Sequence, residues 1–305
     1  MCTELFHQPS RIGWYCWTVN VYGIWLVDHL IPPMQIPKVV SSLLNKLQNT
    51  KIEIPRCVKK RIPHKNDIHR MWEATSYKDA CEYASALFFD DDDHSVRFWG
   101  KRAMCTHLMR DSVAPTGKFL PPPTPNIVYG HSKDSLCQTN SPKLPTWLAE
   151  AKAATGLYYP FLVIKMQGQE TNSDGDSHEA INYCIVTSSI CVGMIDKLNE
   201  SLSEVYNGNV PEQSNDAVSG IVANGGVARA YVTYVWGKDV EYTLKVASFL
   251  LEDLEHHLKF YKLVRSIVEW GNGERLRQIL SALRLIQLGD PRWYRYPSHD
   301  TDVSF

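Results

Sequence analysis

The stretch from Tyr158 to Met166, which reads YYPFLVIKM, gives the clearest strand signal in this chain of 305 residues. Its residues are aromatic, aliphatic and partly β-branched, and these types pack well on a pleated surface. A continuous apolar run of this length is typical of a strand that is covered on both faces. We therefore expect residues 158–166 to form a central, buried strand.

The segments around this strand predict a mixture of strands and helices. Ile127 and Val128 indicate a short strand before it, and residues 178–202 a helix after it. Gly225 and Gly226 lie between two further apolar runs, which is a strong hairpin signal. This order is typical of an α/β fold. No GxGxxG sequence follows a strand, so a dinucleotide-binding unit is excluded.

Apolar residues at helical spacing predict further helices elsewhere in the chain. These segments are residues 39–47, 68–88, 147–155 and 240–270. We expect Gly271 and Gly273 to end the last of them, because glycine commonly follows the end of a helix. Residues 274–288 then form a separate helix.

The charge is balanced overall but uneven along the chain. A net charge of −1 with 44% apolar residues indicates a globular protein and argues against one that coats nucleic acid by bulk electrostatics. Residues 38–70 are basic and residues 71–94 are acidic. The two blocks either pair with each other and with solvent, or the basic block, with Lys59, Lys60 and Arg61 at its centre, contacts a phosphate backbone.

The cysteines and the N-terminal segment bear on the compartment. Eight cysteines are scattered without a CxxC pair, which is typical of reduced thiols in an intracellular protein. No signal-peptide pattern is present, and no segment before residue 35 is long enough to span a membrane. We expect a cytoplasmic or nuclear protein that is not secreted. Residues 1–35 are rich in Trp and Tyr and form either a peripheral strand or helix on the core or an aromatic segment that binds a partner or a membrane surface.

Three short segments, in this order, carry a resemblance to a known family. Pro125–Gly130 (PNIVYG) looks like PD-(I/Y)-x-Y-G, Pro160–Gln167 (PFLVIKMQ) looks like PF-x-V-x-E-x-K, and Ala180–Cys184 (AINYC) looks like A-x-N-Q-C. The chain thus resembles fungal proteins with a PD-(D/E)XK nuclease-like domain of uncharacterised function.

The resemblance implies a restriction-endonuclease-like α/β core over residues 120–288, in which helices flank a mixed sheet. An N-terminal helical and aromatic extension would occupy residues 1–119, and a tail residues 289–305.

In that family, acids on two neighbouring strands hold Mg²⁺, and a lysine helps to activate the attacking water. The three matching positions here are Asn126, Lys165 and Gln167. An amide, an ammonium and an amide supply no anionic oxygen, so the resemblance implies a degenerate motif. We expect no tightly bound Mg²⁺ at these positions and no other cofactor.

Other polar residues follow the central strand. Asp174, Asp176 and Glu179 are either a solvated acidic turn before a helix or relocated metal ligands. His178 and Tyr183 lie near them in the sequence and are further candidates for proton transfer or hydrogen bonding.

Three functions remain open from the sequence. The first is a catalytically inactive nuclease-like module that binds nucleic acid or a protein. The second is a non-hydrolytic enzyme that reuses the same cleft for a small molecule, in a fungal specialised-metabolite pathway. The third is an active nuclease with relocated metal ligands.

Overall fold

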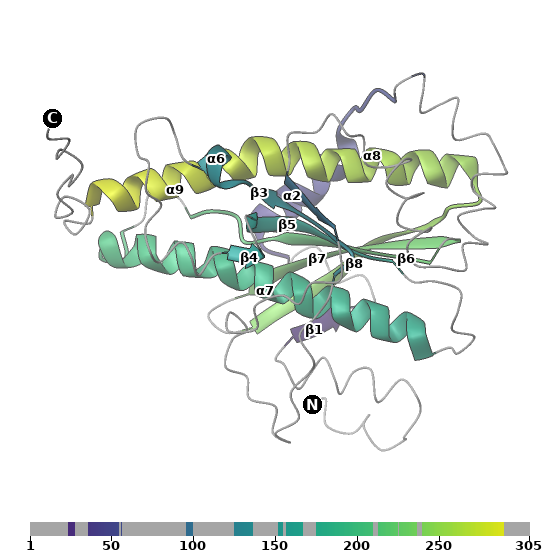
Figure 1. The fold of residues 1–305 in the computed structure, drawn as a ribbon, viewed down its shortest axis with the longest axis horizontal. Coiled ribbons are helices and arrows are strands. Elements are labelled where there is room, and N and C mark those ends of the chain that lie inside the picture. Colours follow the sequence, from purple (N-terminus) through teal and green to yellow (C-terminus); the bar gives the residue numbers. More distant parts are fainter. Residues whose placement is uncertain are drawn as a thin grey trace, which may run out of the picture.

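A computed structural model describes residues 24–27, 36–54, 56, 96–99, 125–136, 152–154, 157–166, 175–209, 213–224, 226–236 and 240–289. In these ranges the chain forms an α/β fold with one mixed sheet and helices on both of its faces (Figure 1). The strands are β1 Ile24–Val27, β2 Val96–Trp99, β3 Ile127–His131, β4 Lys152–Ala154, β5 Leu157–Met166, β6 Val218–Ala223, β7 Val227–Trp236 and β8 Val240–Leu250. The helices are α2 Lys38–Asn49, α6 Lys133–Leu136, α7 Gly175–Val205, α8 Leu254–Trp270, the π-helix η4 Gly271–Arg275, and α9 Leu276–Gly289.

The predicted central strand is confirmed as β5. The sheet order is β1-β8-β7-β6-β5-β3-β2, and β4 pairs with β5 outside this path. β5 is antiparallel to β3 and parallel to β6, and the chain crosses from β5 to β6 through α7. The register between β3 and β5 shifts near Tyr159, whose φ of 45° lies in the left-handed region just before Pro160. A proline cannot donate a backbone hydrogen bond to a ladder, which fits an irregularity at this point.

The predicted hairpin is confirmed as β6 and β7, which pair antiparallel. Asn224 closes its turn: its Oδ1 accepts a hydrogen bond from the backbone N–H of Val227 at 2.9 Å. The strand predicted at Ile127 and Val128 is β3, and the helix predicted over 39–47 is α2. The helix predicted over 68–88 lies outside the described residues.

The helix predicted over residues 240–270 is wrong in its first third. Residues 240–250 form β8, which pairs antiparallel with β7 along almost its whole length, and the helix begins only at Leu254. Val, Tyr, Thr and Phe are common in this segment and favour strands. Gly237 and Asp239, which lie outside the described residues, are of types that favour turns, and the helical spacing of the segment obscured this signal in the sequence.

The expected helix end at Gly271 and Gly273 is also wrong. α8 continues through the π-helix η4 directly into α9. Gly271 is required for packing, since a Cβ atom there would lie 2.3 Å from the ring of Phe161 on β5. A Cβ at Gly273 would meet nothing within 4 Å.

The helix predicted over 147–155 is contradicted at its end. Residues 152–154 form β4, in which Lys152 lies opposite Tyr158 and Ala154 opposite Leu157. Alanine and lysine are good helix formers, but intrinsic propensity is a small energy, so pairing with the neighbouring strand β5 overrides it. At one edge of the sheet, β1 pairs parallel with β8, so residues 24–27 of the aromatic N-terminal segment form a peripheral strand.

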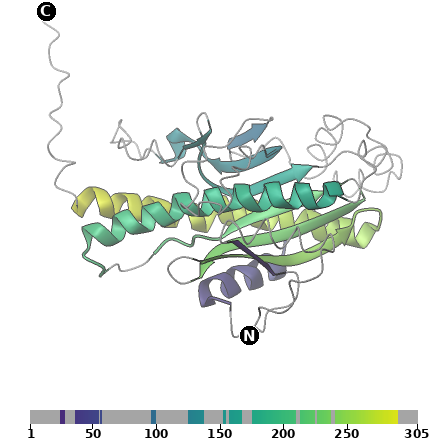
Figure 2. The same cartoon turned by 90° about the horizontal axis from the view of Figure 1, so that it is seen from below.

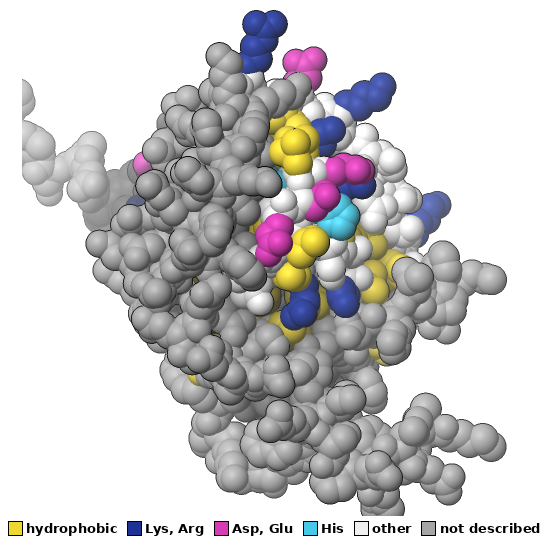
Figure 3. Space-filling view, turned by 90° about the vertical axis from the view of Figure 1, so that its right-hand side faces the viewer, with side chains coloured by type: hydrophobic (Ala, Val, Ile, Leu, Met, Phe, Trp, Pro, Cys, Tyr) yellow, Lys and Arg dark blue, Asp and Glu magenta, His cyan; other side chains and the backbone are white. Residues whose placement is uncertain are grey.

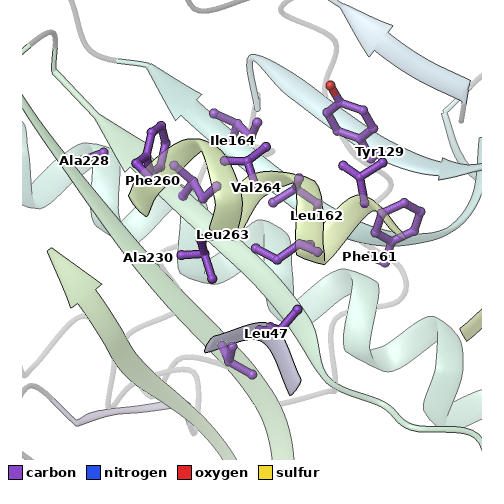
Figure 4. Packing of buried hydrophobic residues seen from close by; sticks show 14 of the residues in the cluster. Leu47, Tyr129, Phe161, Leu162, Ile164, Ala228, Ala230, Phe260, Leu263 and Val264 are labelled. Atoms are coloured by element: carbon purple, nitrogen blue, oxygen red, sulfur yellow. The ribbon is translucent and has the colours of Figure 1, made fainter. Parts of the chain in front are cut away.

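Two apolar clusters lie on opposite faces of the sheet. In the first, β5 and β7 pack against α8 and α2 through residues such as Leu162, Ala230 and Val264 (Figure 4). In the second, the other face of the sheet packs against α7, and α7 packs against α9. Figure 2 shows α7 running across this second face. Three described elements that precede residue 120, namely β1, α2 and β2, thus belong to the same sheet or core.

Helix α7 is unusually apolar. Its segment Ala180–Val205 has the length and composition of a membrane span, but 78% of the most apolar window is buried inside the protein. Burial in the second cluster accounts for these apolar residues, so α7 is the core helix of the fold. The compartment of the protein stays a prediction.

Candidate functional site

Asn126 is held at the start of β3 by two hydrogen bonds to β5. Its backbone N–H donates to the carbonyl oxygen of Ile164 at 3.0 Å, and its side-chain Oδ1 accepts from the backbone N–H of Met166. The residue is only 1% exposed. The side chain of Asn126 thus takes over one ladder bond between the strands. Its oxygen, at the position where the sequence resemblance expects a metal ligand, already accepts a backbone hydrogen bond.

Lys165 lies on β5, between Ile164 and Met166, the two residues that Asn126 contacts. Its neighbours Ile164 and Met166 belong to the α8 side of the sheet, so the alternation of a strand places Lys165 on the α7 side. There its Nζ lies 5.0 Å from the centre of the Tyr183 ring on α7, which is a cation–π contact. Lys165 and Tyr183 are both half-buried.

Tight packing of α7 on the sheet closes the site on its inner side. The Sγ of Cys184, next to Tyr183, lies 3.7 Å from the carbonyl oxygen of Ile221 on β6. A Cβ at Gly220 would lie 2.9 Å from that Sγ, so only glycine permits this approach. Burial raises the pKa of the Cys184 thiol to about 12, although the charge of Lys165 acts in the opposite direction. Cys184 is therefore a packing residue and no nucleophile.

The residues that match the nuclease motif do not fit a divalent cation. Asn126 offers a neutral oxygen that already accepts a hydrogen bond, and Lys165 offers a positive charge and no lone pair. Magnesium binding requires several oxygen ligands, usually with carboxylates among them. Among the residues that the structure describes, no group of three His, Cys, Asp or Glu side chains is placed to hold a metal ion.

A model of one protein family matches residues 27–283 of the chain, and it is described as a domain of unknown function, DUF7924. The chain belongs to the DUF7924 family. The matched range includes the motif positions, α2, the first apolar cluster and the second cluster up to Leu283. No curated protein and no solved structure matches the chain.

The structure places the remaining predicted site residues of this DUF7924 member only in part. Gln167 and Asp174 lie outside the described residues, as do Lys59, Lys60 and Arg61. Asp176, His178 and Glu179 lie in the first turns of α7, where the helical backbone is described. Residue 179 is one helical turn before Tyr183 and so lies on the same side of α7 as that ring.

Two further cations share the site's face of the sheet, and the motif does not point to them. Arg229 on β7 lies opposite Val222 on β6, and Val222 in turn lies beside Lys165 on β5. Lys245 on β8 lies opposite Tyr231. Arg229 and Tyr231 are two residues apart on β7, and the alternation of a strand places them on the same face. The sequence does not place Lys245 on this face, because its apolar spacing predicts a helix over residues 240–270 where the structure has β8.

A second group of buried polar residues lies away from Lys165, where η4 meets the sheet. Arg275 is fully buried, and its guanidinium donates to the carbonyl oxygens of Pro160 at 3.3 Å, Asn215 at 3.2 Å, and Ala217. Burial lowers its pKa to about 10, while the charge of Asp216 acts to raise it. These bonds tie the π-helix to β5 and to the segment before β6. The group is a structural cross-link within the core.

Proposed function

We propose that this DUF7924 protein is a nuclease-like protein that does not hydrolyse nucleic acid and acts as a binding module. The observation that carries the proposal is the pair Asn126 and Lys165. The amide oxygen of Asn126 accepts a backbone hydrogen bond from Met166, and an ammonium stands on the neighbouring strand where the motif has its second acid.

The arrangement of the elements supports a nuclease-like core. The motif positions Asn126 and Lys165 lie on neighbouring antiparallel strands, β3 and β5. A long helix then leads to β6, which is parallel to β5. This mixed sheet with flanking helices is what the sequence resemblance predicts.

The electrostatics argue against metal-dependent cleavage. Hydrolysis of a phosphodiester needs stabilisation of the charge that develops on the phosphate and activation of a water molecule, and a bound metal supplies both. The Lys165 ammonium repels a cation at this place. It attracts a phosphate, but attraction of the ground state alone does not accelerate the chemical step. Binding without hydrolysis is therefore the function that these side chains support.

The decisive experiment compares metal binding and cleavage in two proteins. We expect the wild type to show no Mg²⁺ or Mn²⁺ binding by calorimetric titration and no cleavage of DNA or RNA with Mg²⁺ present. The triple variant Asn126→Asp, Lys165→Glu and Gln167→Lys restores the ligand types of the motif, and we expect it to gain Mg²⁺ affinity. Lys262→Glu, on the exposed side of α8, makes the same charge change as Lys165→Glu and is expected to gain none.

One outcome favours a different function. Residue 179 lies one turn from Tyr183 on the same side of α7, which is where a relocated acid would have to stand. Robust Mg²⁺-dependent cleavage by the wild-type protein that disappears in Asp174→Ala, Asp176→Ala or Glu179→Ala would refute the proposal. It would establish an active nuclease with relocated ligands.

A further inference from the structure

We infer that α2 is an exchangeable helix, and that its groove also accepts the α2 helix of a second copy of this chain. The α2 groove is the surface of the first apolar cluster that α2 covers beside α8. This surface lies on the opposite face of the sheet from the contact between Lys165 and Tyr183. The inference is therefore independent of the proposed function.

Three apolar side chains anchor α2 in the groove. Val40, Leu43 and Leu47 are buried and belong to the first apolar cluster, as do Ala230 on β7 and Leu263 on α8 (Figure 4). Positions i, i+3 and i+7 lie on one side of a helix. An amphipathic helix that binds in an apolar groove uses this spacing.

The hydrogen bonds of α2 make it separable from the sheet. In the part of the chain that the structure describes, its backbone hydrogen bonds stay within residues 37–52. The side chains of Asn49 and Thr50 also donate to carbonyl groups of α2 itself. A strand that leaves a sheet loses backbone hydrogen bonds to its neighbours. On leaving its groove, α2 loses side-chain contacts and keeps no backbone partner waiting in the described core.

One ion pair fixes how α2 lies in the groove. The Nζ of Lys46 lies 2.5 Å from the Oε2 of Glu274 on η4. The two side chains are 49% and 37% exposed, so the pair contributes little to affinity. Charge pairs of this kind instead select the direction and the register of the bound element.

The helical structure of α2 depends on the groove. Its N-cap residue, Pro37, makes no side-chain capping bond, and its first turn has no acid. Lys38 instead places a positive charge at the positive end of the helix dipole. A helix of 12 residues is marginal in water on its own. Folding of α2 is therefore coupled to docking, and an empty groove can fold the same segment of another copy.

A second copy is the occupant that the structure supports, because its α2 has the same three anchors and the same lysine. Residues 28–37 link α2 to β1 in the sequence, and residues 50–95 link it to β2. An extended chain covers about 3.3 Å per residue, so links of this length allow exchange. Exchange of an identical element between two copies forms a dimer at low cost, since the contacts are those of the monomer.

The test mixes two variants with opposite charge changes. Lys46→Glu places two acids at the ion pair, and Glu274→Lys places two lysines there. Exchange of α2 between the two variants restores an opposite-charge pair in both grooves. We expect each variant alone to be mainly monomeric and the mixture to form a heterodimer, which native mass spectrometry detects.

The matched control replaces Glu274→Lys by Glu255→Lys in the mixture. Glu255 also forms an exposed ion pair, with Lys259 at 2.6 Å, at the beginning of α8. Basic and acidic side chains lie side by side there (Figure 3), away from α2. We expect no heterodimer with this control. A mixture of Lys46→Glu and Glu274→Lys that stays monomeric, or a control that dimerises equally, would overturn the exchange.

A labelled peptide of residues 36–54 measures the groove directly by fluorescence anisotropy. We expect it to bind the double variant Leu43→Asp and Leu47→Asp, whose own α2 is displaced. Binding to the wild type should be about tenfold weaker or less, because α2 of the same chain competes at a high effective concentration. The peptide with both changes should bind neither protein.

Three outcomes of the peptide experiment would contradict a separable α2. They are equal binding of the peptide to both proteins, no binding to either, and a double variant that circular dichroism shows to be unfolded. The mixing experiment uses exposed positions alone and so decides the exchange even where the double variant fails to fold.

Discussion

Acidification should destabilise this protein through one buried side chain, His131 on β3. The residue is 2% exposed, and its ring lies 5.4 Å from that of Phe161. Burial, with the nearby positive charge of Arg275 as a second cause, lowers the pKa of His131 from 6.5 to about 3. The folded protein therefore keeps this imidazole neutral over a pH range in which the unfolded chain protonates it.

The sign and size of the effect follow from proton linkage. Between pH 6.5 and 3 the unfolded state binds more protons at this residue, so the stability contributed by neutral His131 is complete above pH 6.5 and is lost as the pH falls. Each pH unit below 6.5 removes about 1.4 kcal/mol. The loss is about 2 kcal/mol at pH 5, and its upper limit near pH 3 is about 5 kcal/mol.

Urea denaturation at pH 7 and pH 5 measures this loss. The variant His131→Phe keeps an aromatic ring beside Phe161 but has no titrating group. We expect the wild type to lose about 2 kcal/mol more free energy of unfolding than this variant does between the two pH values. Other histidines titrate in both proteins, so their contribution cancels in the difference. An equal loss in the two proteins would refute the buried, neutral state of His131.

Three further predictions concern packing in the core. Gly271→Ala should lower the free energy of unfolding in urea by about 1–3 kcal/mol, because the new Cβ would overlap the Phe161 ring. Gly273→Ala is its control: the new Cβ has open space around it, so this variant should be neutral or slightly more stable. Arg275→Met should lower the free energy of unfolding by about 3 kcal/mol or more, because three buried carbonyl groups lose their donor. Arg277→Met, at an exposed position, is the control. Similar free energies of unfolding for the two variants would contradict this role of Arg275. Cys184 should react with a thiol reagent only after unfolding, since burial raises its pKa to about 12; rapid labelling in native buffer would show that α7 opens.

The parts of the fold that the sequence predicted well are those with one dominant local pattern. β5 and α7 each have long apolar runs. The hairpin of β6 and β7 is marked by Asn224 and the glycines that follow it, so its position depends only on residues that are close in the sequence. β8 was misjudged because its apolar residues fit helical spacing while its residue types favour a strand. Pairing with β7 decides between the two, and that contact is not local.

The residues of the candidate site also differ in how far the sequence could predict them. Asn126 and Lys165 were predictable, because short motifs name them. The row from Lys165 to Arg229 was not, because it depends on the register of three strands. The place of Gly271 likewise depends on Phe161, more than 100 positions earlier in the chain.

The continuous helical rod formed by α8, η4 and α9 has a consequence for cooperativity. At about 1.5 Å per residue, residues 254–289 extend over roughly 50 Å (Figure 1). The first half of the rod packs in the cluster on one face of the sheet, and Ile279, Ala282 and Ile286 in its second half pack with α7 in the other. Helices α7 and α8 therefore cannot separate from the sheet without disturbing the rod, which packs in the apolar clusters on both faces. The amide protons of α7 and α8 should therefore exchange with solvent as one unit, with the same free energy of opening.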